Sequence, residues 1–441
     1  MGVKVAKFGG SSVADAIQIR KLRDIIKADD SIHYVVVSAP GKRYADDSKI
    51  TDLLYLCKTH IEHKIPYEQI FQVICDRYVS TEENLCVDVD IKSELEKIRA
   101  ELEKGATADY IASRGEYLNA KIIAAFLGFD FVDAQEIIKF NEKGKLMDDL
   151  TNDLIGKTLK NHEFAVIPGF YGEKLEDGAI KTFSRGGSDI TGALIARGVN
   201  ADVYENWTDV SGFLMADPRI VSNPKPIEKI SYMELRELSY MGASVLHEEA
   251  IFPAKAEGIP INIRNTNRPE DKGTMITADL EVHENQIVSG IAGRKNFTVI
   301  AIYKNHLANE KGFIRRLAGI IEDHDMTIEH LPTGIDTMSV VIDNNVLNGK
   351  LDEVVEEIKY QLKPDSVDVV EDMALIATVG AGMSARKGTS ARLFASLADA
   401  GVNIRMIDQG SSEMNIIVGV EEKDFETAIT AIYKACVEYS I

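Results

Sequence analysis

Residues 3–12 read Val3-Lys4-Val5-Ala6-Lys7-Phe8-Gly9-Gly10-Ser11-Ser12, a short apolar strand that ends in two glycines and two serines. A helical pattern follows, from about Ala14 to Ile26. Such a turn directs backbone N–H groups and the positive end of the helix dipole toward one point, which suits an anion such as a phosphate. Lys7 can add a full charge there, although a Walker A loop has its lysine after the glycines. The pair Gly9-Gly10 alone suits a plain strand-to-helix turn equally well.

Length and composition predict an ordinary globular protein with several domains. The chain has 441 residues, enough for two to four domains, with 45% hydrophobic and 27% charged residues. Its net charge of −20 disfavours nucleic acid or an anionic membrane as partner, so a polyanionic ligand needs a local basic pocket. The four cysteines show no paired spacing and no apolar run reaches about 18 residues, so we expect reduced thiols, no membrane span and a cytoplasmic location.

Further strands alternate with helices along the first two-thirds of the chain. Apolar stretches lie at 33–41, 129–133 and 164–170; the first is closed by small residues and the last contains Pro-Gly near its end. Thr51-Asp52 is expected to cap a helix. This alternation predicts an α/β sandwich with a mostly parallel sheet. Ligands in such folds bind at the carboxyl ends of the strands.

A second glycine stretch, Thr-Phe-Ser-Arg-Gly-Gly-Ser-Asp at 182–189, also opens a helix. Arg185 can bind a carboxylate or a phosphate through two parallel hydrogen bonds. Asp189 falls in the first helical turn, where it could orient Lys7 or help to hold a phosphate-bound metal ion. Helix capping alone is the alternative, but capping does not require Arg-Gly-Gly.

Two more stretches carry candidate ligand contacts. Ser-Arg-Gly-Glu at 113–116 stands where a long amphipathic helix takes shape, and Glu116 could hold an ammonium group or could be a surface carboxylate favoured by the helix dipole. Thr208-Asp209 follows a strand and could bond a ribose or a phosphate, and Arg219 could reach a phosphate.

Together these motifs resemble the aspartate kinases of the amino-acid-kinase superfamily. The resemblance rests on Lys-Phe-Gly-Gly-Ser-Ser at 7–12, Ser-Arg-Gly-Glu at 113–116, Phe-Ser-Arg-Gly-Gly-Ser-Asp at 183–189 and Thr-Asp-Val-Ser-Gly at 208–212, with Ala-Asp-Pro-Arg at 216–219. It spans the whole chain and implies a three-layer sandwich, the amino acid kinase fold, over residues 1–285. It also implies ATP- and Mg²⁺-dependent phosphorylation of the side-chain carboxylate of L-aspartate, which opens the biosynthesis of lysine, threonine and methionine.

The resemblance implies roles for the matched residues. Lys7 and Asp189 would serve catalysis, with Asp189 organising Lys7, and no protein ligand for a metal is certain. The nucleotide contacts would be Lys7, Gly9, Gly10, Ser11, Thr208, Asp209, Arg219, Ser244 and Val245.

The implied aspartate site lies on the other glycine loop and its neighbours. Arg185 would bind the α-carboxylate of aspartate. The full set of aspartate contacts would be Ser38, Thr51, Glu116, Arg185, Gly186, Gly187 and Ser188. Two departures stand out: Leu214 where the family often has tyrosine, and Ser244 where it often has a nucleotide-contacting lysine.

The last third of the chain contains an internal repeat. Lys311-Gly312 recurs as Lys387-Gly388, and the same spacing matches Arg316 with Arg392. Each copy is predicted to have the β-α-β-β-α-β order of a ferredoxin-like unit, and the pair resembles the two ACT domains of aspartate kinases.

One strand of the repeat is out of place. The chain after the final helix is short for a closing strand, whereas residues 286–292 form a spare strand before the first copy. We therefore predict that the first copy is inserted within the second. The domains would be 1–285 (catalytic), 296–371 (first ACT domain) and 286–295 plus 372–441 (second ACT domain).

Units of the ACT type bind small amino acids where the first strand meets the first helix, usually across a subunit interface. The resemblance therefore implies an effector, lysine in the first place or threonine, and a homodimer or tetramer formed through these domains. Glu329 could pair with the ammonium of lysine, or be a solvated strand residue. The candidate effector contacts are Asn309, Gly312, Phe313, Ile314, Thr327, Ile328 and Glu329.

Two alternatives stay open. One is another carboxylate kinase of the superfamily, acting on glutamate or acetylglutamate, which Ser-Arg-Gly-Glu and the ACT pair disfavour. The other is a non-catalytic amino-acid sensor on the same fold. The absence of lysine at Ser244 favours the sensor, whereas Lys7, Arg185 and Asp189 together oppose it.

Overall fold

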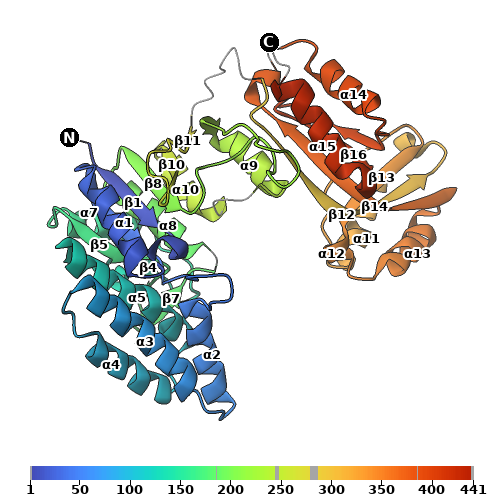
Figure 1. Ribbon diagram of the computed structural model, residues 1–441. Helices are drawn as coiled ribbons and strands as arrows, with labels where there is room; N and C mark the ends of the chain where they lie inside the picture. The colour runs from blue at the N-terminus through green and yellow to red at the C-terminus, as the bar shows by residue number, and fades with distance from the viewer. Residues whose placement is uncertain (1, 185, 244–247, 279–286, 385, 439–441) are drawn as a thin grey trace. The chain divides into compact units, whose positions relative to one another are not determined.

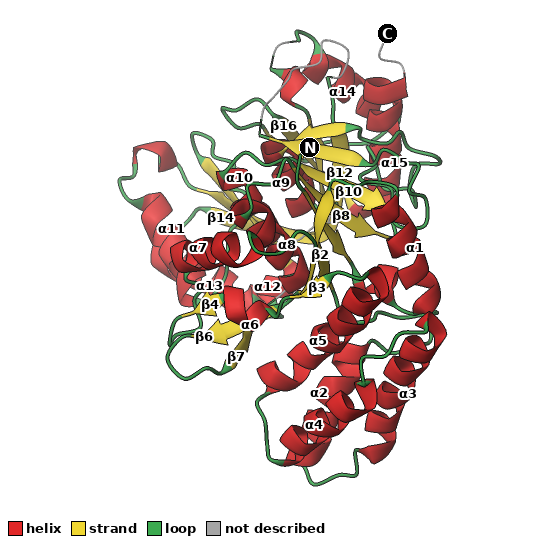
Figure 2. Cartoon of the chain, turned by 90° about the vertical axis from the view of Figure 1, so that its left-hand side faces the viewer, coloured by secondary structure: helices red, strands yellow, loops and turns green. Residues whose placement is uncertain are grey.

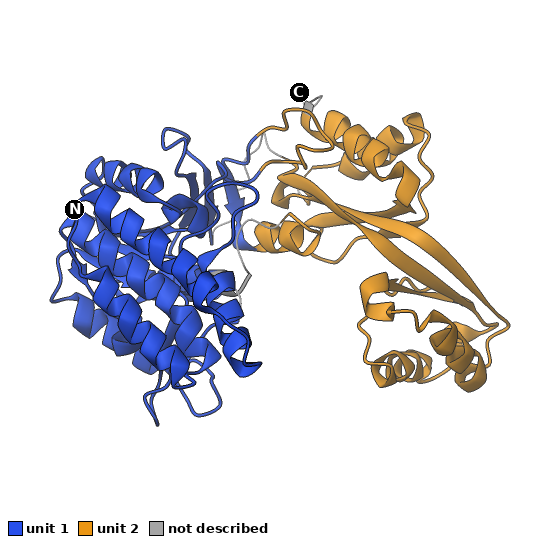
Figure 3. Cartoon of the chain, turned by 60° about the horizontal axis from the view of Figure 1, so that its bottom comes forward, with its two compact units in different colours: residues 1–213, 226–232, 245–280 blue, residues 214–225, 233–244, 281–441 orange. Residues whose placement is uncertain are grey.

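The computed structural model describes residues 2–184, 186–243, 248–278, 287–384 and 386–438 (Figure 1). The chain divides into two compact units (Figure 3). Unit 1 comprises residues 1–213, 226–232 and 245–280, and unit 2 comprises residues 214–225, 233–244 and 281–441. Among the described residues, no helix combines the length and the apolar character that crossing a membrane requires.

The main sheet of unit 1 has eight strands in the described part of the chain, in the order β3-β5-β2-β1-β8-β10-β11-β9. Neighbours from β3 through β10 are parallel, whereas β10 and β11 are antiparallel. The mainly parallel sheet predicted from the sequence is therefore confirmed. The strands are β1 (Lys4–Phe8), β2 (Ile32–Val37), β3 (Asp130–Phe131), β5 (Ala165–Pro168), β8 (Val203–Thr208), β9 (Lys229–Ser231), β10 (Ile261–Asn265) and β11 (Thr274–Thr277).

Helices cover both faces of this sheet, and Figure 2 shows α1 and α8 on opposite sides of β2 and β8. Ala6 and Phe8 of β1 belong to the core formed with α1 to α5, whereas Lys7, one position out of phase, faces α8. The elements of this unit are η1 (Gly10–Val13), α1 (Ala16–Lys27), α2 (Ile50–Glu62), α3 (Glu68–Leu85), α4 (Ile91–Glu103), α5 (Ala108–Leu127), α6 (Ala134–Ile137), α7 (Asp148–Leu159), α8 (Gly187–Gly198) and α10 (Glu248–Ala256), with a small sheet of β4 (Lys139–Phe140), β6 (Tyr171–Lys174) and β7 (Ile180–Thr182).

Two expected helix starts differ from the structure. Thr51-Asp52 does not cap α2, which begins at Ile50 because the Ile50 N–H donates to the Pro40 carbonyl and the Ile50 side chain is fully buried. Helix α5 begins at Ala108, capped by the Thr107 hydroxyl, so Ser-Arg-Gly-Glu at 113–116 lies within the helix rather than at its start.

Unit 2 contains a sheet of five described strands in the order β13-β12-β14-β16-β15. The long strands β12 and β14 run side by side through the unit (Figure 3). The strands are β12 (Gly290–Tyr303), β13 (Thr337–Asp343), β14 (Ser366–Val379), β15 (Met406–Asp408) and β16 (Asn415–Glu421). The helices are α9 (Tyr232–Tyr240), η2 (Leu307–Asn309), α11 (Phe313–Asp323), α12 (Asn344–Leu347), α13 (Leu351–Leu362), η3 (Ala381–Met383), α14 (Thr389–Asp399), η4 (Glu422–Asp424), α15 (Phe425–Tyr433) and η5 (Lys434–Glu438).

Strand β12 serves both copies of the repeat. Its first half, Gly290 to Arg294, pairs with Leu375 to Val379, the first strand of the second copy, whereas its second half pairs with β13 of the first copy. This is the pairing that the inserted arrangement requires. Strand β14 runs unbroken across the predicted limit at 371–372, and the limit at 285 lies outside the described residues, so the domain limits stay a prediction.

A tight approach between β10 and β11 gives a first test of the fold. Gly273 has a φ of +71°, and a Cβ there would lie 1.9 Å from the Ile263 carbonyl oxygen. We expect Gly273→Ala to destabilise unit 1 by roughly 3 kcal/mol or more, because left-handed strain adds to a clash with backbone. The matched control is Gly105→Ala, where φ is +87° with nothing within 4 Å, and it should cost only about 1 kcal/mol. Urea unfolding followed by Trp207 fluorescence measures both, and equal shifts would contradict the prediction.

Candidate functional site

The carboxyl ends of four neighbouring strands of unit 1 meet at one edge of the sheet. After β1, the Gly9 N–H donates to the Trp207 carbonyl of β8 at 2.9 Å. After β2, the Ser38 N–H donates to Phe8, and the Gly169 N–H after β5 donates to Val37. The first glycine loop predicted from the sequence therefore begins at this edge, together with the loops that follow β2 and β5, and open α/β sheets bind ligands at such an edge.

Lys7 and Asp189 come together at this edge. The Lys7 Nζ lies 2.5 Å from Asp189 Oδ1, and Lys7 is only 7% exposed. The Asn206 amide also donates to Oδ1, at 2.8 Å, which fixes the carboxylate. Within the described residues, the second oxygen, Oδ2, accepts no hydrogen bond. Asp189 is thus placed to orient Lys7 while keeping one oxygen available.

Asn206 was not anticipated from the sequence. It is buried on β8 between the large apolar residues Tyr204 and Trp207. A polar side chain in a central parallel strand is unusual, because such strands are buried on both faces. That departure from an apolar run is the signal that could have identified it.

The first glycine loop packs directly against the loop that follows β2. The Gly41 N–H donates to the Gly10 carbonyl at 2.9 Å, and a Cβ on Gly41 would lie 2.6 Å from the Gly10 carbonyl carbon. Gly9 lies close to the charge, since a Cβ there would be 3.6 Å from the Lys7 Nζ. Ser11 follows in η1. The loop is therefore held close to Lys7 with its backbone uncovered.

Glu116 is buried, so the surface alternative for this residue is wrong. The Ala39 N–H donates to its carboxyl group, but Oε2 has no hydrogen-bond partner among the described residues. Burial raises the pKa of Glu116 to about 8. Because an unsatisfied buried carboxyl oxygen requires explanation, Glu116 is a candidate for binding a cationic group of a ligand.

Residues around Glu116 join it to the sheet edge. A Cβ on Gly115 would lie 2.8 Å from the Ala39 Cβ, so α5 passes close to the loop after β2. The Asn119 amide donates to the Ser38 carbonyl at 2.8 Å. Glu116 and Ser38 are therefore on adjoining segments, and Thr51 stands in the first turn of α2.

The second glycine loop reaches the end of β5. Gly186 caps α8 with a φ of +60°, and a Cβ on Gly169 would lie 2.7 Å from the Ser188 side chain. A Cβ on Gly187 would lie 2.7 Å from the Phe170 ring. These contacts place Gly186, Gly187 and Ser188 beside the carboxyl end of β5. Arg185 lies outside the described residues.

The remaining predicted nucleotide contacts are only partly placed. Thr208 ends β8 at the same edge, and its hydroxyl donates to the exposed Asp209 carboxylate at 3.2 Å. Arg219 belongs to unit 2, where its side chain is 88% exposed and pairs with Asp217 at 2.6 Å. Ser244 and Val245 lie outside the described residues.

In unit 2, the Glu329 carboxylate already has a hydrogen-bond donor and a nearby cation as partners. The Tyr240 hydroxyl donates to Oε2 of Glu329 at 2.5 Å, and Arg294 lies 3.8 Å from its Oε1. With its side chain 10% exposed, Glu329 is not a solvated strand residue.

The other candidate effector contacts differ in what they offer a ligand. The Phe313 ring is buried in the core of the first copy, which leaves only its backbone for a ligand. Gly312 caps α11, and Ile314 is half exposed. Asn309 and Thr327 are exposed, and Ile328 packs against the same core.

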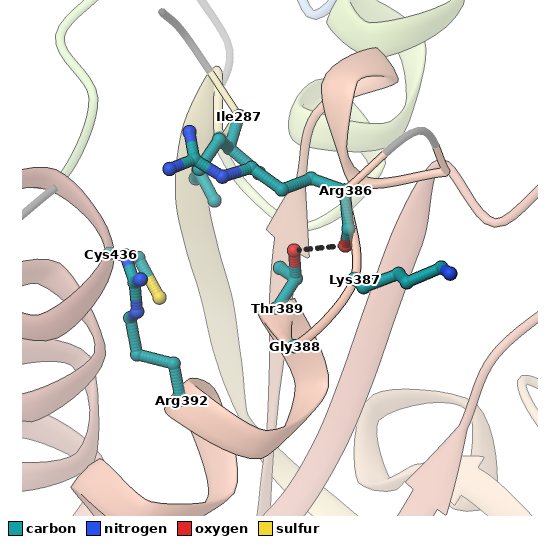
Figure 4. Close-up of a pocket in the computed structure, with 8 residues that line it drawn as sticks. Ile287, Arg386, Lys387, Gly388, Thr389, Arg392 and Cys436 are labelled. Carbon is teal, nitrogen blue, oxygen red and sulfur yellow. Dashed lines mark hydrogen bonds between the residues drawn. The ribbon is translucent and has the colours of Figure 1, made fainter. Parts of the chain in front are cut away.

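A pocket of about 270 Å³ lies at the start of α14, apart from all the predicted sites (Figure 4). Figure 4 shows Arg392 directed toward Cys436 and Lys387 directed away from it. The repeat matches Arg386 here with Glu310 of the first copy, and Glu310 pairs with Arg316. The matching turns of the two copies therefore differ in charge. The pocket is lined by Ile287, Val288, Arg386, Lys387, Gly388, Thr389, Arg392 and Cys436.

Family models match both parts of the chain. Residues 2–265 match the amino acid kinase family and residues 376–436 match the ACT domain. Aspartokinase 3 of Bacillus subtilis is 38% identical over 451 residues, a match that covers 98% of each chain.

Solved structures agree with these matches. The aspartate kinase of Clostridium acetobutylicum is 53% identical, with a TM-score of 0.92 over 99% of this chain and 100% of that one. Aspartokinase III of Escherichia coli, 25% identical, has a TM-score of 0.74 in complex with aspartate and ADP and of 0.75 in complex with lysine and aspartate. These two matches cover 98% and 99% of this chain, and 99% of the other chain in each case.

Proposed function

The chain belongs to the amino acid kinase family, and within it to the aspartokinases, and on that premise we propose that it transfers the γ-phosphoryl group of ATP to the side-chain carboxylate of L-aspartate. The observation that carries the proposal is the ion pair between buried Lys7 and half-buried Asp189 at the glycine-lined edge of the sheet. This arrangement places the Lys7 ammonium beside a glycine loop whose Gly10 and Ser11 backbone N–H groups would bind phosphate oxygens. A triphosphate and a carboxylate can approach each other only where such charge offsets their repulsion.

Different sets of the described residues would bind the two substrates. Lys7 and the loop of Gly9, Gly10 and Ser11 would bind the transferring phosphates, and the position of Asp189 supports its role of holding Lys7 in place. Phosphoryl transfer needs mainly positioning and charge neutralisation, so no covalent nucleophile is required. Thr208 and Asp209, at the end of β8, would contact the nucleotide.

Aspartate would bind between α5 and the start of α8. Glu116, with its buried unsatisfied oxygen, would accept the α-ammonium group, and Arg185 would bind the α-carboxylate. Gly186 to Ser188 would line the site beside β5, with Ser38 and Thr51 nearby. Fixing both α-substituents leaves the side-chain carboxylate free to face the phosphate.

The residues at this edge fit a magnesium ion bound mainly through phosphate oxygens. Mg²⁺ prefers oxygen ligands, keeps several waters and often uses only one or two protein carboxylates. Asp189 Oδ2, which accepts no hydrogen bond from a described residue, would be one such ligand. When bound, the ion would neutralise charge that develops on the phosphate oxygens.

An ATP-dependent hydroxamate assay tests the substrate. We expect product with L-aspartate and none with L-glutamate or N-acetyl-L-glutamate. Activity with either control instead would favour another carboxylate kinase, and inactivity with all three would favour a non-catalytic sensor.

We further propose that lysine, or failing that threonine, binds the first ACT copy and inhibits, and that the protein assembles as a dimer or tetramer through these domains. Glu329 supports this proposal, because a ligand ammonium would compete with Tyr240 and Arg294 for its carboxylate. Such competition would couple the ligand to α9, which ends at Tyr240.

Lysine inhibition therefore gives a prediction for Glu329. We expect Glu329→Gln to raise the lysine concentration for half-inhibition at least tenfold, since the charge-assisted contact is worth about 1.5–3 kcal/mol. Activity without lysine should stay within twofold of the unsubstituted enzyme. Glu322→Gln, an exposed substitution on α11, is the matched control and should leave inhibition unchanged. An unaltered half-inhibition in Glu329→Gln would remove this residue from the effector site.

A further inference from the structure

Arg77 is a buried cation that the proposed mechanism does not use. It lies on α3 and is 6% exposed. Its Nη1 donates to the Ser48 carbonyl at 2.7 Å, and its Nη2 donates to the carbonyls of Gly41 at 2.6 Å and Ala14 at 3.3 Å. Arginine is almost never buried unless its charge is paired or hydrogen-bonded, so these backbone contacts are what allows Arg77 to lie inside the unit.

The three carbonyls come from two connecting segments at the proposed active-site edge. Ala14 directly follows η1, the turn that continues the first glycine loop. Gly41 lies near the start of the loop between β2 and α2, and Ser48 lies near its end, just before α2, whose first turn contains Thr51. One guanidinium therefore joins the nucleotide loop, the loop beside it and the segment that leads to the aspartate site.

These segments cannot shift independently of one another. Gly41 and Gly10 are in direct backbone contact, with a hydrogen bond of 2.9 Å and no room for a Cβ between them. Displacing Gly41 would consequently displace Gly10. Gly10 is adjacent in sequence to Gly9, which lies close to the Lys7 Nζ.

Asp47 completes the cluster. Its Oδ2 lies 3.6 Å from Arg77 Nη1 and accepts hydrogen bonds from the Arg43 backbone N–H at 3.0 Å and from Arg43 Nε at 2.8 Å. The polar segment between β2 and α2 is thereby folded onto Arg77.

We propose that Arg77 is a positioning residue for phosphoryl transfer, whose guanidinium holds the first glycine loop, the loop after β2 and the start of α2 in register. The guanidinium reaches the three carbonyls from two separate nitrogens held in one plane, and the single ammonium nitrogen of lysine cannot reproduce this geometry. The proposal rests on the proposed function, because that function makes the first loop the phosphate site.

Steady-state kinetics of Arg77→Lys and Arg77→Gln test this role. We expect both variants to lose at least tenfold in kcat/KM for ATP. A purely structural role would lower the melting temperature and leave kcat and both KM values of the folded fraction unchanged. Arg77→Lys keeps the charge, so a loss in that variant assigns the effect to the fork.

Arg197→Gln is the matched control. Its guanidinium is also largely buried and bonds Asn152 at 3.2 Å and Asp148 at 2.8 Å, which ties the far end of α8 to α7. We expect it to lower the melting temperature while leaving kcat and KM within twofold of the unsubstituted enzyme.

The outcomes separate this inference from the proposed function. An unsubstituted enzyme inactive with aspartate would overturn the function, whereas an active enzyme with unchanged kcat/KM in Arg77→Lys would overturn the positioning role alone. If neither Arg77 variant folds, Asp47→Asn decides, since it weakens the same cluster without an internal cavity. A rise of threefold or more in the KM for ATP supports the role, and an unchanged KM rejects it.

Discussion

Lys7→Ala should lower kcat by about 10³-fold, the cost of removing a buried, preorganised positive group from a site where negative charge develops. The Lys7 side chain is only 8% exposed and is aligned by Asp189. Water in the alanine variant would replace it poorly, because a solvent dipole must reorient during the reaction. The measurement is kcat from ADP release at saturating ATP and aspartate, with a melting curve to confirm folding.

Lys4→Ala is the control for this result. Lys4 lies on the same strand, three positions earlier, and pairs with Asp29 at 2.6 Å and with Glu205 at 3.4 Å. Its removal should leave kcat within twofold. A Lys7→Ala enzyme that retains a tenth or more of the kcat would show that phosphate charge is neutralised elsewhere and would overturn the assigned role.

The placement of Lys7 could be predicted because its causes are local. An apolar strand that ends in glycines and runs into a helix fixes where the loop points, and the alternation of β1 turns Lys7 toward α8. The second glycine stretch opens α8 at Gly187 for the same reason. Motif order then indicated that both loops belong to one site.

Burial around Glu116 could not be predicted in this way. It depends on Ala39 and Ile50 packing against Gly115, and on the Tyr78 hydroxyl donating to the Gly115 carbonyl at 2.7 Å. These residues are brought together by tertiary packing, and a local pattern of charged residues looks the same whether its helix face is covered or not. The contacts of Arg77 could not be predicted for the same reason, because its partners are backbone carbonyls that no sequence motif marks.

The internal repeat shows a different limit to what the sequence can predict about the fold. Matching residues such as Gly312 and Gly388 cap helices α11 and α14 as the duplication predicts. The strands, however, are longer than one copy, since β12 and β14 each continue from one copy into the other. A repeat in the sequence reveals equivalent positions, but whether two short strands join into one depends on the register of their partners.

The second large effect concerns Glu116 and pH. With a pKa of about 8, this carboxyl is mostly protonated at pH 7 when no ligand is present. Binding an ammonium group requires the carboxylate, so aspartate must displace a proton below pH 8. We expect kcat/KM for aspartate to rise close to tenfold per pH unit between pH 6 and 7.5 and to level off near pH 8, while kcat/KM for ATP at saturating aspartate changes much less.

Glu116→Gln separates this cause from other titrations. The amide cannot ionise, so the slope in kcat/KM for aspartate should disappear while the value at pH 8 falls by roughly 100-fold, as expected for a lost charge-assisted contact. Glu116→Asp keeps the carboxylate and should keep a pH-dependent slope. The same slope in Glu116→Gln as in the unsubstituted enzyme would assign the titration to another group.

The free energy of unfolding of the ligand-free protein should also depend on pH through Glu116, but in the opposite direction to kcat/KM. Because the folded-state pKa of Glu116 is raised above its unfolded value of 4.5, the folded protein binds more protons between pH 4.5 and about 8. This contribution is fully present below pH 4.5 and is lost as pH rises toward 8, by on the order of 1 kcal/mol per pH unit. The free energy of unfolding, followed by Trp207 fluorescence, should therefore decrease from pH 5.5 to 8 relative to that of Glu116→Gln. Saturating aspartate should reduce this pH-dependent difference, because a bound ammonium group stabilises the ionised form of Glu116. A kinetic slope without this stability slope would mean that the proton belongs to the substrate rather than to the buried carboxyl.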